Sequence, residues 1–193
     1  WESSELDVHG HLGLLVLDGL LTRRETIGAL DYTELLGTGD LLRPWTVGSH
    51  ATLLTAANWE VLVPTRIAIL DRDFALRARP WPEIVATLLD RAVMRSRSLG
   101  VILAIHRAVR VEERLELMLW HLADRWGHVT PEGVVVPIAL THDSLGKLIG
   151  ARRSPVTVGL GNLKRDGVVR RGQRGSWILS AASRPAPPDA NGA

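Results

Sequence analysis

The sequence contains no cysteine among its 193 residues. This absence excludes disulfide bonds, cysteine-ligated zinc, iron–sulfur clusters and thiol catalysis. Long apolar runs are missing as well: uncharged stretches such as residues 12–17 and 101–105 fall far short of the roughly 18 residues that a membrane span needs. No basic-then-apolar signal opens the chain, so we expect a cytoplasmic protein with no membrane partner.

Lysine is scarce, with two Lys among the 23 basic residues, and charge is unevenly distributed. Residues 141–179 hold eight basic side chains against two carboxylates, a net charge of +6, whereas residues 1–140 carry −4. A basic block beside an acidic partner domain suggests a module that binds a polyanion, although a solvated basic surface explains the charge equally well. The excess of Arg over Lys runs through the whole chain, so we attribute it to coding bias.

Residues 6–73 have the pattern of β structure. Short apolar runs alternate with turn signals: Asp18-Gly19 predicts a hairpin turn, residues 37–40 predict a second turn, and Pro64-Thr65 predicts a break between two strands. Such spacing is typical of a sandwich or barrel.

The period changes to helical after Pro82, a residue suited to a first helical turn. A heptad seam about three repeats long follows, made of Val85, Leu89, Ala92, Ser96, Leu99, Leu103 and His106. The seam predicts a dimerisation helix over residues 81–106; the alternative is an amphipathic helix that lies on the β domain. A second helix is expected from Val111 to Trp126, with Gly127 as its stop, and residues 134–140 resemble a strand.

The basic block contains the capping and termination signals of two short helices. Thr141 is suited to cap the first helix and Gly150 to end it. Ser154-Pro155 then predicts the cap and first turn of a second helix. Its apolar face is Val156, Leu160 and Leu163, and Gly146 and Gly159 mark where the two helices approach each other closely.

Residues 168–179 complete a helix-turn-helix with a wing. Two short strands flank a glycine-bounded turn, so that Arg174 is expected at the wing tip and Arg170 and Arg171 at its base. The N-terminal part of a recognition helix enters the major groove, where Arg donates two hydrogen bonds to guanine. The second helix therefore predicts DNA binding.

Residues 140–157 (LTHDSLGKLIGARRSPVT) and 163–169 (LKRDGVV) strongly resemble the DNA-binding domain of Crp/Fnr-type bacterial transcription regulators. A looser resemblance covers residues 35–42 and 69–74. The resemblance implies an α+β architecture with a cyclic-nucleotide-binding-like β-roll (jelly-roll-like) over 1–80, a dimerisation helix over 81–106, and a winged helix-turn-helix over 107–180. A disordered tail is expected over 181–193, and the roll is expected to lack its N-terminal part.

The same resemblance assigns roles to individual residues. Arg153, Ser154 and Thr157 are expected to read bases. The residues expected to contact DNA phosphates are Thr141, Arg152, Lys164, Arg170, Arg171 and Arg174. The dimer seam is expected to use Val85, Leu89, Ala92, Leu99 and Leu103. Family members often have Glu where Ser154 stands, so the preferred half-site is expected to differ.

The effector site is where the chain departs from the family. A Gly-Glu pair followed by an Arg-Ser/Thr-Ala run, which binds the cyclic nucleotide, is absent, so we expect no cyclic AMP binding and no cofactor. Arg43 is a weak substitute for the phosphate partner. Trp45 and Trp59 are candidates for an apolar effector pocket, with core packing as the more favoured interpretation.

Other chemistry finds little support. His9 and His11 have metal-ligand side chains but no third ligand, so we predict a surface pair and no metal. Thr141, His142 and Asp143 supply catalytic residue types, yet neighbouring side chains point apart, so we expect no enzyme.

We therefore predict a homodimeric, sequence-specific regulator on palindromic DNA. RNA polymerase is a further candidate partner, and the β-roll is expected to bind an unidentified small-molecule effector or none. Two alternatives stay open: a sensor of the same fold with only non-specific DNA affinity, and a dimeric module that contacts the transcription machinery.

Overall fold

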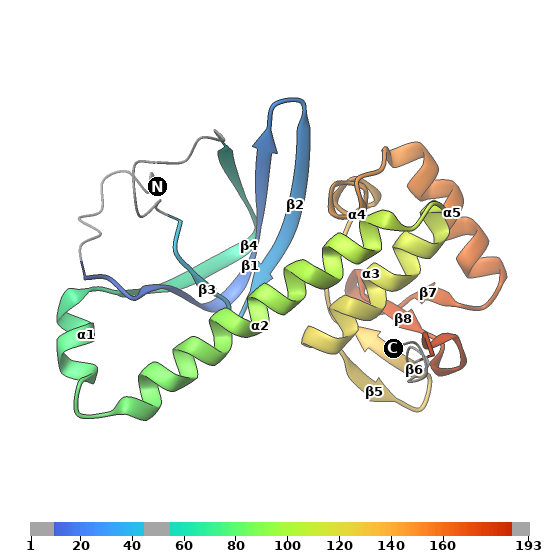
Figure 1. The fold of residues 1–193 in the computed structure, drawn as a ribbon. Coiled ribbons are helices and arrows are strands. Elements are labelled where there is room, and N and C mark those ends of the chain that lie inside the picture. Colours follow the sequence, from blue (N-terminus) through green and yellow to red (C-terminus); the bar gives the residue numbers. More distant parts are fainter. Residues whose placement is uncertain (1–9, 45–54, 187–193) are drawn as a thin grey trace, which may run out of the picture. The chain divides into compact units, whose positions relative to one another are not determined.

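The computed structural model describes residues 10–44 and 55–186 (Figure 1). The chain divides into two compact units between Gly100 and Val101, a point that lies inside helix α2 (Pro82–Arg107). The α+β architecture predicted from the sequence is confirmed: a strand-rich N-terminal part, a long helix and a C-terminal helix-turn-helix with a wing.

The first unit is built around one long strand. β1 (Gly13–Ile27) pairs with β2 (Leu30–Gly37) and β3 (Leu41–Leu42) on one side and with β4 (Ala56–Leu70) along its whole length on the other. All of these pairings are antiparallel. The helix α1 (Arg72–Ala78) follows, capped by Asp71, whose carboxylate accepts a hydrogen bond from the Phe74 backbone N–H at 2.7 Å.

The predicted hairpin turn at Asp18-Gly19 is wrong. β1 continues through these residues, and its register against β4 shifts there, so that Pro64-Thr65 lies opposite as part of the same bulge. Gly19 has φ +92°, and an added Cβ would lie 2.3 Å from the Pro64 carbonyl oxygen. Both turn signals are therefore used to bend two paired strands without ending either. The turn itself is at Gly28-Ala29, between β1 and β2.

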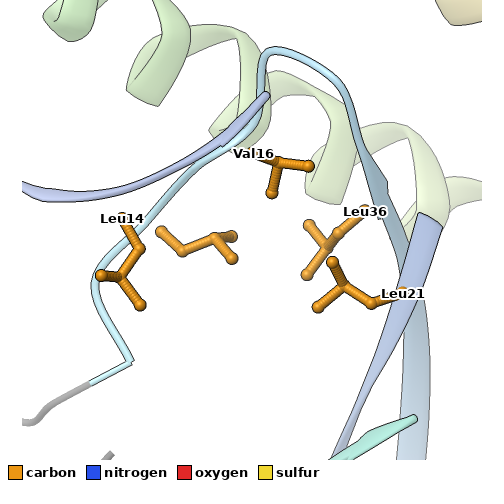
Figure 2. Packing of buried hydrophobic residues seen from close by; sticks show 5 residues of the cluster. Leu14, Val16, Leu21 and Leu36 are labelled. Carbon is orange, nitrogen blue, oxygen red and sulfur yellow. The ribbon is translucent and has the colours of Figure 1, made fainter. Parts of the chain in front are cut away.

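Apolar clusters lie on both faces of the sheet, because neighbouring residues such as Leu41 and Leu42 belong to different clusters. Figure 2 shows the side chains of Leu14, Val16, Leu21 and Leu36 converging, and Trp59 packs against this cluster. A second cluster joins the sheet to helix α2 through Leu41, Leu70 and Leu88. Burial of these leucines, at about 2 kcal/mol each, holds the helix on the sheet.

A buried carboxylate also links the sheet to α2. Glu34 on β2 is 2% exposed and accepts hydrogen bonds from Arg23 at 3.3 Å and from Arg95 of α2 at 2.5 Å. Two arginines around one carboxylate leave a net positive charge, which Glu25 offsets by pairing with Arg23. The pairing orients α2 because a buried charge that lost its partner would cost several kcal/mol.

The second unit contains helix α3 (Val111–Trp126), strands β5 (His128–Thr130) and β6 (Gly133–Val136), helices α4 (His142–Ile149) and α5 (Arg153–Arg165), and strands β7 (Val169–Arg171) and β8 (Trp177–Leu179). The short helices η2 (Gln173–Gly175) and η3 (Ala181–Ser183) complete it. The sheet order is β5-β6-β8-β7.

The bounds of α3 are the predicted ones, and its core side chains Leu115, Leu119 and Leu122 are buried. Two expectations need correction. The strand predicted over residues 134–140 ends at Val136, because only three of its residues pair with β8. The expected disordered tail begins with an ordered turn, η3, in which the Ser183 hydroxyl donates to the Ser180 carbonyl. Residues 187–193 lie outside the described part.

Candidate nucleic-acid interface

The first helix of the candidate motif is capped at both ends as predicted. The Thr141 hydroxyl accepts a hydrogen bond from the Ser144 backbone N–H at 3.0 Å. Gly150 ends α4 in the left-handed conformation (φ 64°, ψ 41°), which costs a glycine nothing. A Cβ at Gly146 would lie 2.5 Å from the Ala151 carbonyl oxygen, so this glycine lets the turn close onto α4. The two caps set where the next helix begins.

Helix α5 starts two residues earlier than predicted. It begins at Arg153 with Arg152 in the cap position, so Ser154 lies inside the first turn and is not the cap. Pro155 is the third helical residue. The first four backbone N–H groups of a helix have no acceptor within it, so the missing N–H costs nothing there. The predicted inward face is confirmed, since Val156, Leu160 and Leu163 are buried.

Gly159 has a different neighbour from the one expected. A Cβ at this position would lie 3.0 Å from Leu115 Cδ1 of α3, so the glycine permits close packing of α5 on α3, not on α4. Gly146 meets the turn and Val156 of α5. Of the two glycines, only Gly146 lies where α4 and α5 approach each other, as predicted.

The N-terminal end of α5 presents an exposed basic surface. Arg152, Arg153, Ser154 and Thr157 are all exposed. Within the described residues, neither arginine side chain makes a hydrogen bond or an ion pair. Sequence reasoning missed Val158, which is 60% exposed on the same helix. An apolar side chain in that position is suited to contact a thymine methyl group, and its exposure follows only from the packing of α5.

Thr157 already has two partners. Its hydroxyl donates to the Arg153 carbonyl at 3.0 Å and lies 2.9 Å from Nδ1 of His142. Burial, followed by the charges of Arg171 and Arg153, lowers the pKa of His142 below its usual value near 6.5. His142 is therefore neutral at pH 7, and the Thr157 methyl group is the part of this side chain that remains for a base.

The wing is a β7–β8 hairpin closed by η2. Arg174 at its tip is exposed, has a positive φ of 52° and makes no side-chain hydrogen bond or ion pair within the described residues. Arg170 pairs with Glu132. Arg171 lies 3.5 Å from the ring centroid of Trp177 and donates to carbonyl oxygens at the wing and before α4. Two of the three wing arginines are thus engaged internally.

The predicted seam on α2 is exposed in the single chain. Val85 is 47% exposed, Leu89 64% and Leu103 69%. Ala92 is exposed and Leu99 half-buried, whereas α2 packs through other residues, among them Leu88. His106 is not free for a seam contact, because its Nε2 lies 2.8 Å from the Leu148 carbonyl oxygen.

Two of the candidate effector residues, Trp59 and Arg43, lie in the described part of the chain, and both have partners there. Trp59 packs against the leucine core, with the Arg23 guanidinium 5.6 Å from its ring centroid. Arg43 donates weakly to the His11 carbonyl at 3.4 Å. Trp45 and His9 lie outside the described residues. Among the residues that are described, no group of three metal-ligating side chains comes together, and no helix is long and apolar enough to cross a membrane.

Taken together, α3, α4, α5 and the hairpin define the second unit as a winged helix-turn-helix. Comparison with known proteins is more specific: residues 113–182 match the Crp-like helix-turn-helix domain family. The resemblance of this part of the chain to Crp/Fnr-type regulators is therefore confirmed. No match was found among curated proteins.

Solved structures share the fold of both units. A cyclic nucleotide-binding domain containing protein from Listeria monocytogenes is 15% identical, with a TM-score of 0.72 over 88% of this chain and 80% of that one. A CooA mutant from Carboxydothermus hydrogenoformans is 18% identical, with a TM-score of 0.65 over 90% and 76%. A CRP/FNR family transcriptional regulator from Thermus thermophilus is 22% identical, with a TM-score of 0.58 over 86% and 81%. At these identities the matches show a shared fold, and the family match over residues 113–182 identifies the Crp-like helix-turn-helix domain.

Proposed function

We propose that this protein is a homodimeric regulator of transcription that binds two-fold symmetric DNA sites by base readout. The observation that carries the proposal is the exposed N-terminal end of α5, where Arg152 and Arg153 make no ion pair within the described residues. Arginines that are exposed yet unpaired, on a helix held by a buried face, are the arrangement that reads base edges.

Each exposed residue has a role in this proposal. Arg153 donates two hydrogen bonds to guanine O6 and N7, worth about 1–3 kcal/mol of discrimination. Ser154 and the Thr157 methyl group contact neighbouring bases. Phosphates are held by Thr141, Arg152, Lys164 and Arg174, and also by Arg170 and Arg171 where these exchange their internal partners for DNA. Because Ser154 has no carboxylate, it offers cytosine N4 a weaker acceptor than Glu would.

The dimer forms through α2. Val85, Leu89 and Leu103 are exposed on a helix whose other face packs on the sheet, so a second copy of the helix would bury them. Covering three such side chains on each copy is worth several kcal/mol. Two α5 helices related by the dimer axis then enter major grooves about 34 Å apart.

The domain roles follow. Residues 1–80 form the effector domain, 81–106 the dimerisation helix and 107–180 the DNA-binding domain. The effector domain has lost cyclic AMP binding, since the residues that bind the nucleotide in the family are absent from the sequence. Any signal reaches the DNA-binding domain through α2, and contact with RNA polymerase is a further expectation.

The test is selection from random duplex DNA by the purified full chain at near-physiological salt. We expect a two-fold symmetric motif, with one half-site position relaxed in Arg153→Ala. The matched control is Arg165→Ala, because Arg165 is in the last turn of α5 and bonds to Asn162 at 3.2 Å. The control should enrich the wild-type motif. Binding without an enriched motif, fading as salt rises, would refute base readout.

A further inference from the structure

A cavity of about 200 Å³ lies between the N-terminus of α4, one side of α5 and the wing. The residues that matter here are His142, Thr157, Lys164, Arg170, Arg171 and Trp177. We call this cavity the wing pocket. It is several times larger than the roughly 30 Å³ share of one water molecule, so it has room for a small polyatomic ion.

The lining of the wing pocket is positively charged. Lys164, Arg170 and Arg171 contribute to it, and no carboxylate does. Arg170 is offset by Glu132, and Arg171 is engaged with backbone carbonyls, but Lys164 makes no hydrogen bond or ion pair within the described residues. The Lys164 ammonium group therefore lines a pocket that has no carboxylate in its lining.

A buried tryptophan, Trp177, also lines the pocket. Trp177 is 3% exposed, and its indole N–H has no hydrogen-bond partner in the described structure. The Arg171 guanidinium covers its ring face at 3.5 Å. The stacked pair of Trp177 and Arg171 therefore forms one wall of the pocket, beside Lys164.

We propose that the wing pocket binds one phosphate group, and that in the DNA complex this is a single backbone phosphate between the major-groove helix and the wing. The choice of DNA as the source rests on the proposed function. The pocket lies between α5, which carries Arg153, and the hairpin with Arg174 at its tip, where a strand leaving the groove would pass. Lys164 supplies the charge, and the pair of Trp177 and Arg171 borders the bound group.

The phosphate would also change the state of His142. Burial, Arg171 of β7 and Arg153 of α5 together disfavour its protonated form in the free protein. An anion in the pocket opposes the two arginine charges, and Lys164 and Arg170 add to the positive field that it neutralises. Binding should therefore raise the pKa of His142, so that a DNA phosphodiester, whose charge does not change near neutral pH, binds more tightly as pH falls.

The first arm of the test needs no DNA. Inorganic phosphate is titrated into the ¹⁵N-labelled full chain at low ionic strength, while the Trp177 indole and His142 ring resonances are followed by NMR. We expect saturable shifts of both, weakened at least five-fold in Lys164→Gln. The matched control is Lys147→Gln, which removes the other lysine of the chain, an exposed residue paired with Asp143 at 3.2 Å. Both substitutions are at exposed positions, so loss of folding does not obscure the result.

The second arm uses the selected duplex with one phosphate at a time replaced by a neutral methylphosphonate. We expect one position in each half-site whose neutralisation weakens wild-type binding about ten-fold and Lys164→Gln binding less than two-fold. Equal sensitivity of both proteins at every position would overturn the DNA contact.

The two arms separate the possible failures. Phosphate shifts without any DNA binding would retain the anion site and refute the proposed function. Phosphate shifts with no coupling on DNA would make the pocket a site for a free anion and overturn the backbone assignment. Specific DNA binding with neither shifts nor coupling would leave the function standing and refute the wing pocket.

Discussion

The ionic-strength dependence of DNA binding follows from which cations are free. Five basic residues are expected at phosphates: Arg152, Lys164, Arg170, Arg171 and Arg174. Of these, Arg170 and Arg171 have internal partners, which leaves three free cations in each protomer. A dimer would then neutralise six phosphates, giving a slope of log K against log salt of about −5. Affinity should fall about 10³-fold between 50 and 200 mM salt.

The perturbation is Arg174→Asn in both protomers. Asn tolerates the positive φ of 52° at this position, so the charge is removed without straining the wing. Loss of two phosphate contacts should change the slope from about −5 to between about −3 and −4. Fluorescence anisotropy of the selected duplex at five salt concentrations measures it. Arg165→Gln, on the last turn of α5, serves as the control and should leave the slope unchanged.

Two results would refute this reasoning. An unchanged slope in Arg174→Asn would mean that the wing tip does not contact DNA. A wild-type slope near about −9 would mean that all five residues contact phosphates, and hence that Arg170 and Arg171 leave their internal partners on binding.

Three further predictions concern stability, measured by urea unfolding. Gly133→Ala should cost at least about 2 kcal/mol, because the new Cβ would lie 2.2 Å from the Leu179 carbonyl oxygen at a φ of +127°; a loss under about 0.5 kcal/mol would contradict this geometry. Glu34→Ala should cost about 3 kcal/mol by leaving two arginines without their shared carboxylate, whereas Asp31→Ala, which breaks an exposed ion pair on the same strand, should cost less than about 1 kcal/mol; equal costs would contradict the role of burial. Burial lowers the pKa of His121 to about 4 in the folded protein. As pH falls, the unfolded chain therefore binds a proton at His121 before the folded chain does. The contribution of neutral His121 to the free energy of unfolding is complete above pH 6.5 and is lost as pH falls from 6.5 toward 4. We expect a loss of about 2 kcal/mol between pH 7 and 4.5, and a smaller loss in His121→Gln.

Local signals in the sequence were sufficient for most of the helix ends in the second unit. Gly127 marks the end of α3, Thr141 caps α4, and Gly150 ends it, because a stop or cap depends on one residue and its immediate backbone. The inward face of α5 was also predicted, since a buried stripe repeats with the helical period. The position of the α5 cap was a local error, since the cap is Arg152 and not Ser154.

Other features depend on partners far away in the sequence. Asp18-Gly19 has the composition of a hairpin turn, yet it forms a bulge because β4 pairs across it and continues on both sides. Gly159 was expected to face α4, but α3 occupies that side. The sequence cannot distinguish these outcomes, because the same glycine permits either backbone, and the long-range neighbour selects one.

The candidate interface divides in the same way. By itself the sequence determined that Arg152, Arg153 and Arg174 are at the ends of a basic helix and wing, since charge and turn chemistry are local. Only the tertiary structure decided that Arg171 is held over Trp177 and that Lys164 remains free beside the wing pocket. A side chain's partners are set by which elements pack around it, and that packing is a property of the whole fold.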